Sequence, residues 1–459
     1  MSAIFYSLWY LFIVSVPFGT RLFLGSVTPG FHEYESFFLY ASDLITVALF
    51  FWFFLWKGDR LAHFIKAAPR LSRLLIALFF VAGFSVFLAP SAALSVYVLA
   101  RFLILGLIAF LVFPYVFAKE KHRLWTIALV AALAVDQAVL GILQFLKQGS
   151  IGLSLLGESV LSNLDPATAS IWYDGARLVR AYGLFPHPNI LSLFLVIGLI
   201  CLGYLYIEFD VVLYQWDKSI SRAQNGLKFI KNWRFSARIL VAISFFLVFT
   251  GLMLTFSRAG WLVGALSLAI FIAFTLRAHF RAALRFLALV LITFSLGYFF
   301  FSPLLTQRAA SLVSGTPAVD YRIAYNEMGL DIILRNPLGV GLGNQVLYGV
   351  ETRVYQGRGM NSVSEWEPIH NIFVLAMAEL GILGGTFFLL LFFLLFWQIF
   401  QRTPTLLRSL SVSLLGAVTI FGLFDHFLWD LHSGRMMLFL VLGFVFSEVI
   451  LFSKKELYS

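Results

Sequence analysis

The stretch EPIHNIFVLAMAELGILGG, residues 367–385, places a proline, a histidine and an asparagine directly before a long apolar run. Pro368 suits the first turn of a helix, where its missing N–H costs nothing, and we expect His370 and Asn371 in the same turn. The positive end of the helix dipole disfavours a charged imidazole and offers N–H groups to an anion. A neutral His370 beside an anion is a candidate general base. The alternative is a histidine that only marks the membrane interface.

The composition is that of a polytopic membrane protein. Of the 459 residues, 61% are hydrophobic and only 12% are charged, a balance that soluble domains of this size do not have. Apolar runs of about 20 residues mark spanning helices. The sequence predicts an all-α fold, with a single integral membrane domain over residues 1–459. About twelve spans are expected, near residues 4–20, 36–56, 74–90, 97–117, 124–146, 190–208, 239–256, 259–276, 286–302, 370–398, 409–424 and 435–453.

Basic residues gather in alternate loops, and this predicts the orientation of the chain. Most of them lie at the C-terminal end and near residues 57–73, 119–123, 218–238, 277–285 and 402–408, among them Arg60, Arg222 and Arg402. By the positive-inside rule this side is cytoplasmic, with both termini on it. The net charge of +10 therefore mostly reflects the orientation of the chain in the membrane, and no nucleic-acid partner is expected.

The two longest predicted loops, residues 147–189 and 303–369, lie on the opposite, extracytoplasmic side. Loops of this length usually carry function. In the second loop, between the ninth and tenth spans, Tyr321–Leu334 has the pattern of a short amphipathic helix. The glycine-rich run PLGVGLGN, residues 337–344, follows a helix rather than a strand, so we interpret it as a turn and not as a dinucleotide-binding loop.

Two arginines on the predicted extracytoplasmic side work against the positive-inside bias. Arg258 lies in a short turn between two apolar runs, and Arg322 lies early in the amphipathic helix. A guanidinium at membrane depth is costly unless it pairs with carbonyls, carboxylates or phosphates. The alternatives to ligand binding are an interfacial Arg258 that reaches the lipid headgroups, and a surface ion pair of Arg322 with Asp320 or Glu327.

A further pattern, RAYGLFPHPN from Arg180 to Asn189, leads into the sixth span. Asn189 is expected to cap that helix, and Gly183 is expected to serve a turn.

The last extracytoplasmic loop contains Asp425, His426, Asp430 and His432. Histidines and carboxylates are metal ligands, but this spacing fits no established signature. We expect an ordinary polar loop here, with substrate contact and metal binding as the alternatives.

His370-Asn371, nine residues and then Gly381-x-x-Gly384-Gly385 resembles the signature of the O-antigen ligase and polymerase family. The Ser257–Arg258 pair, Arg322 early in the large loop and the Arg180 pattern resemble further features of that family. The resemblance implies a helical fold of the GT-C type, located in the bacterial cytoplasmic (inner) membrane. It also implies transfer of a glycan from an undecaprenyl-diphosphate-linked donor to an acceptor hydroxyl on the outer face, without cofactor, metal or nucleotide sugar.

By the same resemblance, His370 is the base, and Arg258 and Arg322 hold the diphosphate. The candidate substrate contacts are Arg180, Asn189, Tyr321 and Asn371. The expected partners are the lipid-linked donor, a lipid or glycan acceptor and membrane lipids. Alternatives are a polymerase or a protein-directed transferase of the same family, and a transporter or flippase of lipid-linked glycans, for which two matching halves or paired broken helices are expected.

Overall fold

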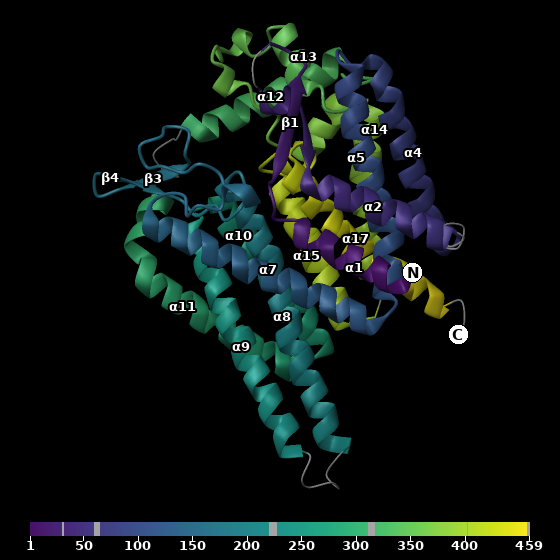
Figure 1. Ribbon diagram of the computed structural model, residues 1–459, viewed down its shortest axis with the longest axis vertical. Helices are drawn as coiled ribbons and strands as arrows, with labels where there is room; N and C mark the ends of the chain where they lie inside the picture. The colour runs from purple at the N-terminus through teal and green to yellow at the C-terminus, as the bar shows by residue number, and fades with distance from the viewer. Residues whose placement is uncertain (30–31, 59–64, 220–226, 311–316, 402, 457–459) are drawn as a thin grey trace. The chain divides into compact units, whose positions relative to one another are not determined.

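The computed structural model describes residues 1–29, 32–58, 65–219, 227–310, 317–401 and 403–456. Arg60, Arg222 and Arg402 of the predicted cytoplasmic loops lie outside these ranges. The described chain is helical apart from loops and two small hairpins (Figure 1). This confirms the predicted all-α membrane fold.

Within the described ranges, nine helices are long and apolar enough to cross a bilayer, and each coincides with a predicted span. The other three predicted spans fall on shorter helices, namely α1 (Ser2–Ser15), α2 (Ala41–Lys57) and α15 (Leu406–Gly422). The second predicted span is too long, because Ser36–Tyr40 forms an extended strand before α2. The number twelve stays a prediction.

The described residues form two compact units. The first unit takes in residues 1–119, 314–401 and 418–459. Its elements, besides α1 and α2, are β1 (Arg21–Ser26), β2 (Ser36–Tyr40), α4 (Pro69–Ser85), α5 (Ala92–Leu107), α6 (Phe113–Phe117), α12 (Pro317–Arg335), α13 (Gln345–Glu351), α14 (Ile372–Phe400), α16 (Phe427–Asp430) and α17 (His432–Glu456). Strands β1 and β2 pair antiparallel, and α14 packs against α4, α12 and α17.

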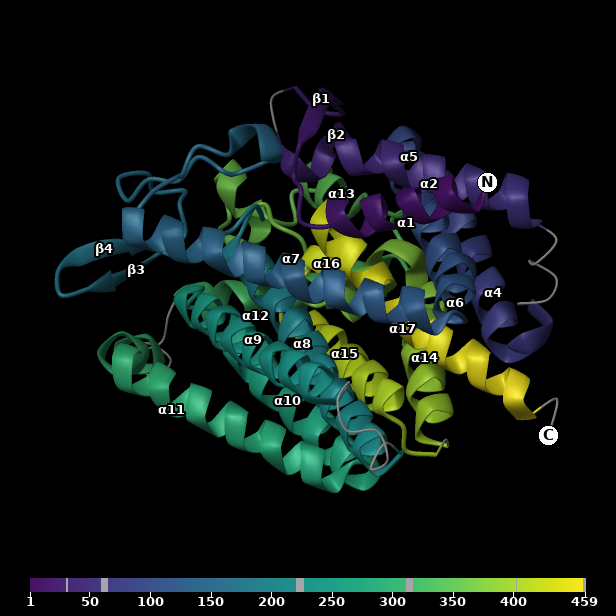
Figure 2. The ribbon, with the colours of Figure 1, turned by 60° about the horizontal axis from the view of Figure 1, so that its bottom comes forward.

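The second unit takes in residues 120–313 and 402–417. It contains α7 (Glu120–Lys147), β3 (Ser170–Tyr173), β4 (Ala176–Val179), α8 (Pro188–Ser219), α9 (Leu227–Leu254), α10 (Arg258–Ala278), α11 (Phe280–Ala310) and the first part of α15. Helix α8 lies at its centre and packs against α7, α9 and α10 (Figure 2). Strands β3 and β4 form an antiparallel hairpin within the predicted loop of residues 147–189.

The predicted loop of residues 303–369 is largely structured. Helix α11 continues to Ala310, so the connection starts later than expected. The predicted amphipathic helix is confirmed as α12, which starts four residues before Tyr321. The run at residues 337–344 is a turn, as predicted, and Gly339, Gly341 and Gly343 all have positive φ angles.

Helix α14 is interrupted at Gly381, where the backbone adopts φ 75° and ψ 174°. At the interruption the carbonyls of Ala378 and Glu379 accept from the backbone N–H groups of Val340 and Gly341, at 3.0 and 2.9 Å, while Ile382 donates to the Pro337 carbonyl at 3.0 Å. The break at Gly381 thus docks the turn at residues 337–341 onto the broken helix.

Replacing Gly381 by alanine is predicted to destabilise the first unit. A Cβ at this position would lie 2.5 Å from the carbonyl carbon of Leu338, and the positive φ is itself strained for an L-residue, by about 1–3 kcal/mol. The apparent unfolding temperature of the protein in detergent should therefore fall. Gly83→Ala in α4 is the matched control, because a Cβ there meets nothing within 4 Å. Equal unfolding temperatures for the two variants would contradict the prediction.

Candidate active site

His370 lies just before α14, not in its first turn as the sequence suggested. The helix begins at Ile372, and Asn371 is its N-cap. The Asn371 side-chain oxygen accepts from the N–H groups of Phe373 and Val374, at 2.9 and 3.3 Å. This capping satisfies two of the orphan donors of the helix end, so it reduces the anion-binding capacity that the sequence predicted there.

The imidazole of His370 is buried and held in one orientation. Its Nδ1 lies 2.9 Å from the Pro368 carbonyl, which can only accept, so Nδ1 carries the proton of the neutral ring. Its Nε2 lies 3.4 Å from a carboxylate oxygen of Glu367. The ring stacks on Tyr325, with centroids 5.0 Å apart, and meets the ring of His426 edge to face at 4.7 Å. The basic nitrogen of the neutral ring is therefore Nε2.

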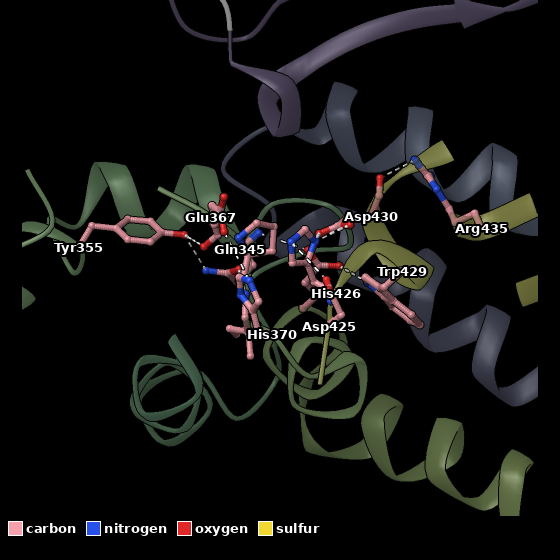
Figure 3. Close-up of polar contacts among 12 residues, drawn as sticks. Gln345, Tyr355, Glu367, His370, Asp425, His426, Trp429, Asp430 and Arg435 are labelled. Atoms are coloured by element: carbon pink, nitrogen blue, oxygen red, sulfur yellow. Dashed lines mark hydrogen bonds and ion pairs between the residues drawn. The ribbon is translucent and has the colours of Figure 1, made fainter. Parts of the chain in front are cut away.

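His426 lies in the last extracytoplasmic loop, which the sequence predicted to be an ordinary polar one. It precedes the single-turn helix α16, and its Nδ1 lies 3.0 and 2.8 Å from the two carboxylate oxygens of Asp430 (Figure 3). Its Nε2 lies 3.8 Å from Asp425. Burial alone would lower the pKa of His426, but Asp430, Asp425 and Glu367 together raise it to about 9. The loop is thus a buried ion pair rather than an ordinary polar surface, and only the four-residue spacing of His426 and Asp430 hinted at it.

The two histidines carry opposite charge states near neutral pH. Burial, then the positive charge on His426 and then that on Arg322 lower the pKa of His370 to about 3, against the opposing effect of Asp425. His370 is therefore neutral while His426 is an imidazolium. The sequence argument expected a neutral His370 from the helix dipole, whereas the structure attributes that state mainly to burial and to a neighbouring cation.

A buried network supports the segment that carries His370. Gln345 accepts from the Ile369 N–H at 3.2 Å and donates to the Tyr355 hydroxyl at 3.3 Å. Tyr355 in turn donates to the Glu367 carbonyl at 2.7 Å (Figure 3). Glu379 accepts from the Trp429 indole at 2.7 Å, which ties α14 to α16. The backbone on both sides of the histidine pair is thus fixed by side chains.

Tyr321 and Arg322 lie on α12 close to Tyr325. Tyr321 donates to the Glu365 carboxylate at 2.9 Å. Its ring stacks on that of Tyr325, with ring centroids 6.2 Å apart. Arg322 is partly buried, and its charge acts on both His370 and Glu367. The structure therefore brings Tyr321, Arg322, His370 and Asn371 together in the first unit.

Arg180, Asn189 and Arg258 belong to the second unit. Asn189 does not cap α8, because Pro188 is its first residue and His187 accepts the Asn189 N–H at 3.1 Å. Instead, Asn189 accepts from Arg180 at 3.0 Å, and Arg180 also donates to the Thr255 carbonyl at 2.6 Å.

The turn from Thr255 to Ser257 gathers basic side chains in the second unit. Arg258 is the first residue of α10, and Ser257 caps that helix by accepting from the Gly260 N–H at 3.1 Å. Arg308 from α11 donates to the Phe256 carbonyl at 3.3 Å. Arg180 and Arg308 thus both donate to the turn that directly precedes Arg258. Arg308 was not singled out from the sequence, because it lies at the end of an apolar helix.

Glu367, His370 and His426 could also hold a metal ion. They offer ligand atoms that all lie within 4.8 Å of one another. A metal ligand must be deprotonated, so a metal would compete here with the proton on His426.

Part of the chain matches a known family. Residues 243–389, which include Arg258, Arg322 and His370, match the family model of O-antigen ligase. No curated protein matches the chain. The matched segment lies in a polytopic helical fold and does not extend to Arg180 or His426. Over residues 243–389 the chain is therefore similar to O-antigen ligase, which supports the resemblance found in the sequence.

Proposed function

We propose that this protein is an O-antigen ligase-like glycosyltransferase that moves a glycan from undecaprenyl diphosphate to an acceptor hydroxyl. The observation that carries the proposal is His370, which is buried and neutral, has its Nδ1 engaged by the Pro368 carbonyl, and lies beside a cationic His426. The match to O-antigen ligase supports the same class of reaction.

The proposed step is a single displacement at the anomeric carbon. The acceptor oxygen forms a bond to that carbon, while the bond from the carbon to the diphosphate oxygen breaks and its electron pair leaves with the diphosphate. Nε2 of His370 takes the proton of the acceptor hydroxyl. A base with a pKa of about 3 takes a proton reluctantly, but a diphosphate bound nearby would raise that pKa through its negative charge. Donor binding would thus activate the base.

The arginines would neutralise the leaving group. Planar guanidinium groups suit the oxygens of a diphosphate, and positive groups placed where charge develops stabilise the transition state. We assign this role to Arg322 and Arg258. Arg180, oriented by Asn189, would contact the phosphate or the glycan. Tyr321, and the side-chain amide nitrogen of Asn371, whose oxygen is occupied in capping, would contact the substrate.

The proposed location is the bacterial cytoplasmic membrane, with both termini inside and His370 facing outward. The alternation of basic loops along the sequence supports this orientation. The reaction requires no cofactor and no metal in this proposal. A polymerase of the same family would use the same residues, and differs only in joining glycan repeat units rather than transferring them to a lipid.

His370→Ala is predicted to abolish transfer, because it removes Nε2, the nitrogen that takes the proton in the proposed step. The measurement is reconstitution of the purified protein with a polyprenyl-diphosphate glycan and candidate acceptors. His279→Ala, at the end of α10, is the control and should retain activity. The length of the product separates ligase from polymerase. Movement of the lipid-linked glycan across liposomes without transfer would instead support a transporter.

Arg322→Ala and Arg258→Ala are each predicted to lower kcat by about 10²–10³, the typical cost of removing one donor that stabilises a developing anion. Both proteins should still insert and purify normally. Arg335→Ala is the matched control, because it removes an exposed arginine from the last turn of α12, the helix that carries Arg322. Wild-type rates in either test variant would remove that arginine from the proposed mechanism.

His426→Gln is predicted to move the acidic limb of the pH profile upward. In the wild type His370 stays neutral above a pKa of about 3, so its titration should not lower kcat/KM between about pH 5 and 8. Removing the imidazolium removes a charge that opposes protonation of His370, and its pKa rises. The variant should therefore lose activity at a higher pH than the wild type does. Superimposable profiles would show that His426 does not control the charge of the base.

A further inference from the structure

A polar cavity lies in the first unit beside the histidine pair. It is open to solvent, and its lining combines charged, polar and aromatic side chains. Its lining includes Pro368 and Asp430, the two residues that hold His370 and His426. The cavity is therefore contiguous with the candidate active site but is not used by the mechanism proposed above.

Arg435, near the start of α17, lines this cavity and is only 5% exposed. Its Nη2 donates to the Asp430 carbonyl at 2.9 Å (Figure 3). In the part of the chain that the structure describes, its Nε and Nη1 are buried and have no hydrogen-bond partner. A buried guanidinium is costly when its donors are unsatisfied, so this side chain is suited to an anionic ligand.

The carboxylates around the cavity already have partners. Glu33 pairs with Arg21, Asp430 with His426, and Glu379 accepts from Trp429. Arg101, whose charge also acts on Arg435, is paired with Asp43. The described lining thus contains one guanidinium, that of Arg435, and two of its buried nitrogens have no hydrogen-bond partner.

The other walls suit a sugar ring. The aromatic side chains of Tyr34, Tyr40, Tyr97 and Trp429 line the cavity. Flat aromatic faces pack against the C–H faces of pyranose rings, and apolar walls with a few fixed polar groups are typical of specific small-molecule sites. An anion lacking a ring would leave these walls unused.

We propose that this cavity binds an anionic sugar residue of the acceptor, with its carboxylate or phosphate group on Arg435. The assignment to the acceptor rests on the proposed function. Asp430 connects the two sites, because its carboxylate holds His426 and its carbonyl holds Arg435. A sugar anchored at Arg435 would extend past Pro368 toward His370, which is where the proposed reaction needs the acceptor hydroxyl.

The test measures sugar binding to the full-length protein in nanodiscs, without any lipid-linked donor. The probes are D-glucuronate, D-glucose 6-phosphate and D-glucose, followed by ligand-observed NMR. At least one anionic sugar should bind about tenfold or more tightly than glucose, as expected for hydrogen bonds to a charged group. The comparison of uronate with phosphate identifies which anion the site prefers.

Three variants assign the preference to Arg435. Arg435→Gln should bind the anionic sugar no better than glucose, and Arg435→Lys should keep part of the preference. Arg358→Gln is the matched control, since Arg358 belongs to the same unit, pairs with Asp331 and does not line the cavity. It should bind all three sugars as the wild type does.

Equal affinity of the wild type for all three sugars would overturn the proposal, and so would an unchanged preference in Arg435→Gln. If the Arg435 variants do not fold, a photoreactive glucuronate on the wild type decides the question. Crosslinks to peptides carrying Tyr97 or residues 429–435 support the site, and crosslinks elsewhere overturn it. Because no transfer is measured, loss of the proposed enzymatic function would leave these binding results unchanged.

Discussion

The break in α14 at Gly381 is the constraint on which the first unit depends. Every backbone N–H and C=O at membrane depth needs a partner, and a broken helix loses several. The turn after α12 supplies them through Val340, Gly341 and Pro337. These hydrogen bonds therefore fix the position of that turn and of Gln345, which follows it. The side chain of Gln345 accepts from the N–H of Ile369, the residue directly before His370. The position of His370, the candidate base, therefore depends on the hydrogen bonds that the backbone needs at the break in the helix.

A second dependence is electrostatic. The carboxylate of Asp430 keeps a proton on His426, and the charge of His426 helps to keep one off His370. Two chemically identical side chains thus acquire different roles from their surroundings, as titratable pairs in active sites often do. His426 needs its carboxylates to stay charged at neutral pH. Burial and the neighbouring cation keep His370 neutral far below the pH at which a free imidazole takes up a proton.

Much of this could be predicted from the sequence. Apolar runs predicted nine long helices within a few residues, since bilayer thickness sets their length, and the alternation of residues in 321–334 predicted α12. The motif around His370 predicted the segment that matches O-antigen ligase. The order of residues along the chain could not show that His426, 56 residues after His370, packs against the His370 ring. Nor could it show that Asn189 orients Arg180 or that Arg308 reaches the turn before Arg258, because these are tertiary contacts.

The cap at Asn371 has a consequence for how such a protein can diversify. A helix end that binds phosphate through its backbone amides ties recognition to the fold, since every residue type supplies the same N–H. Here the cap occupies two of those amides, and in the proposed mechanism arginine side chains on separate helices recognise the charged groups. Single substitutions can then change which anions and sugars are accepted while the helical scaffold stays the same. Related chains could thus serve different cell-surface glycans through small changes in sequence.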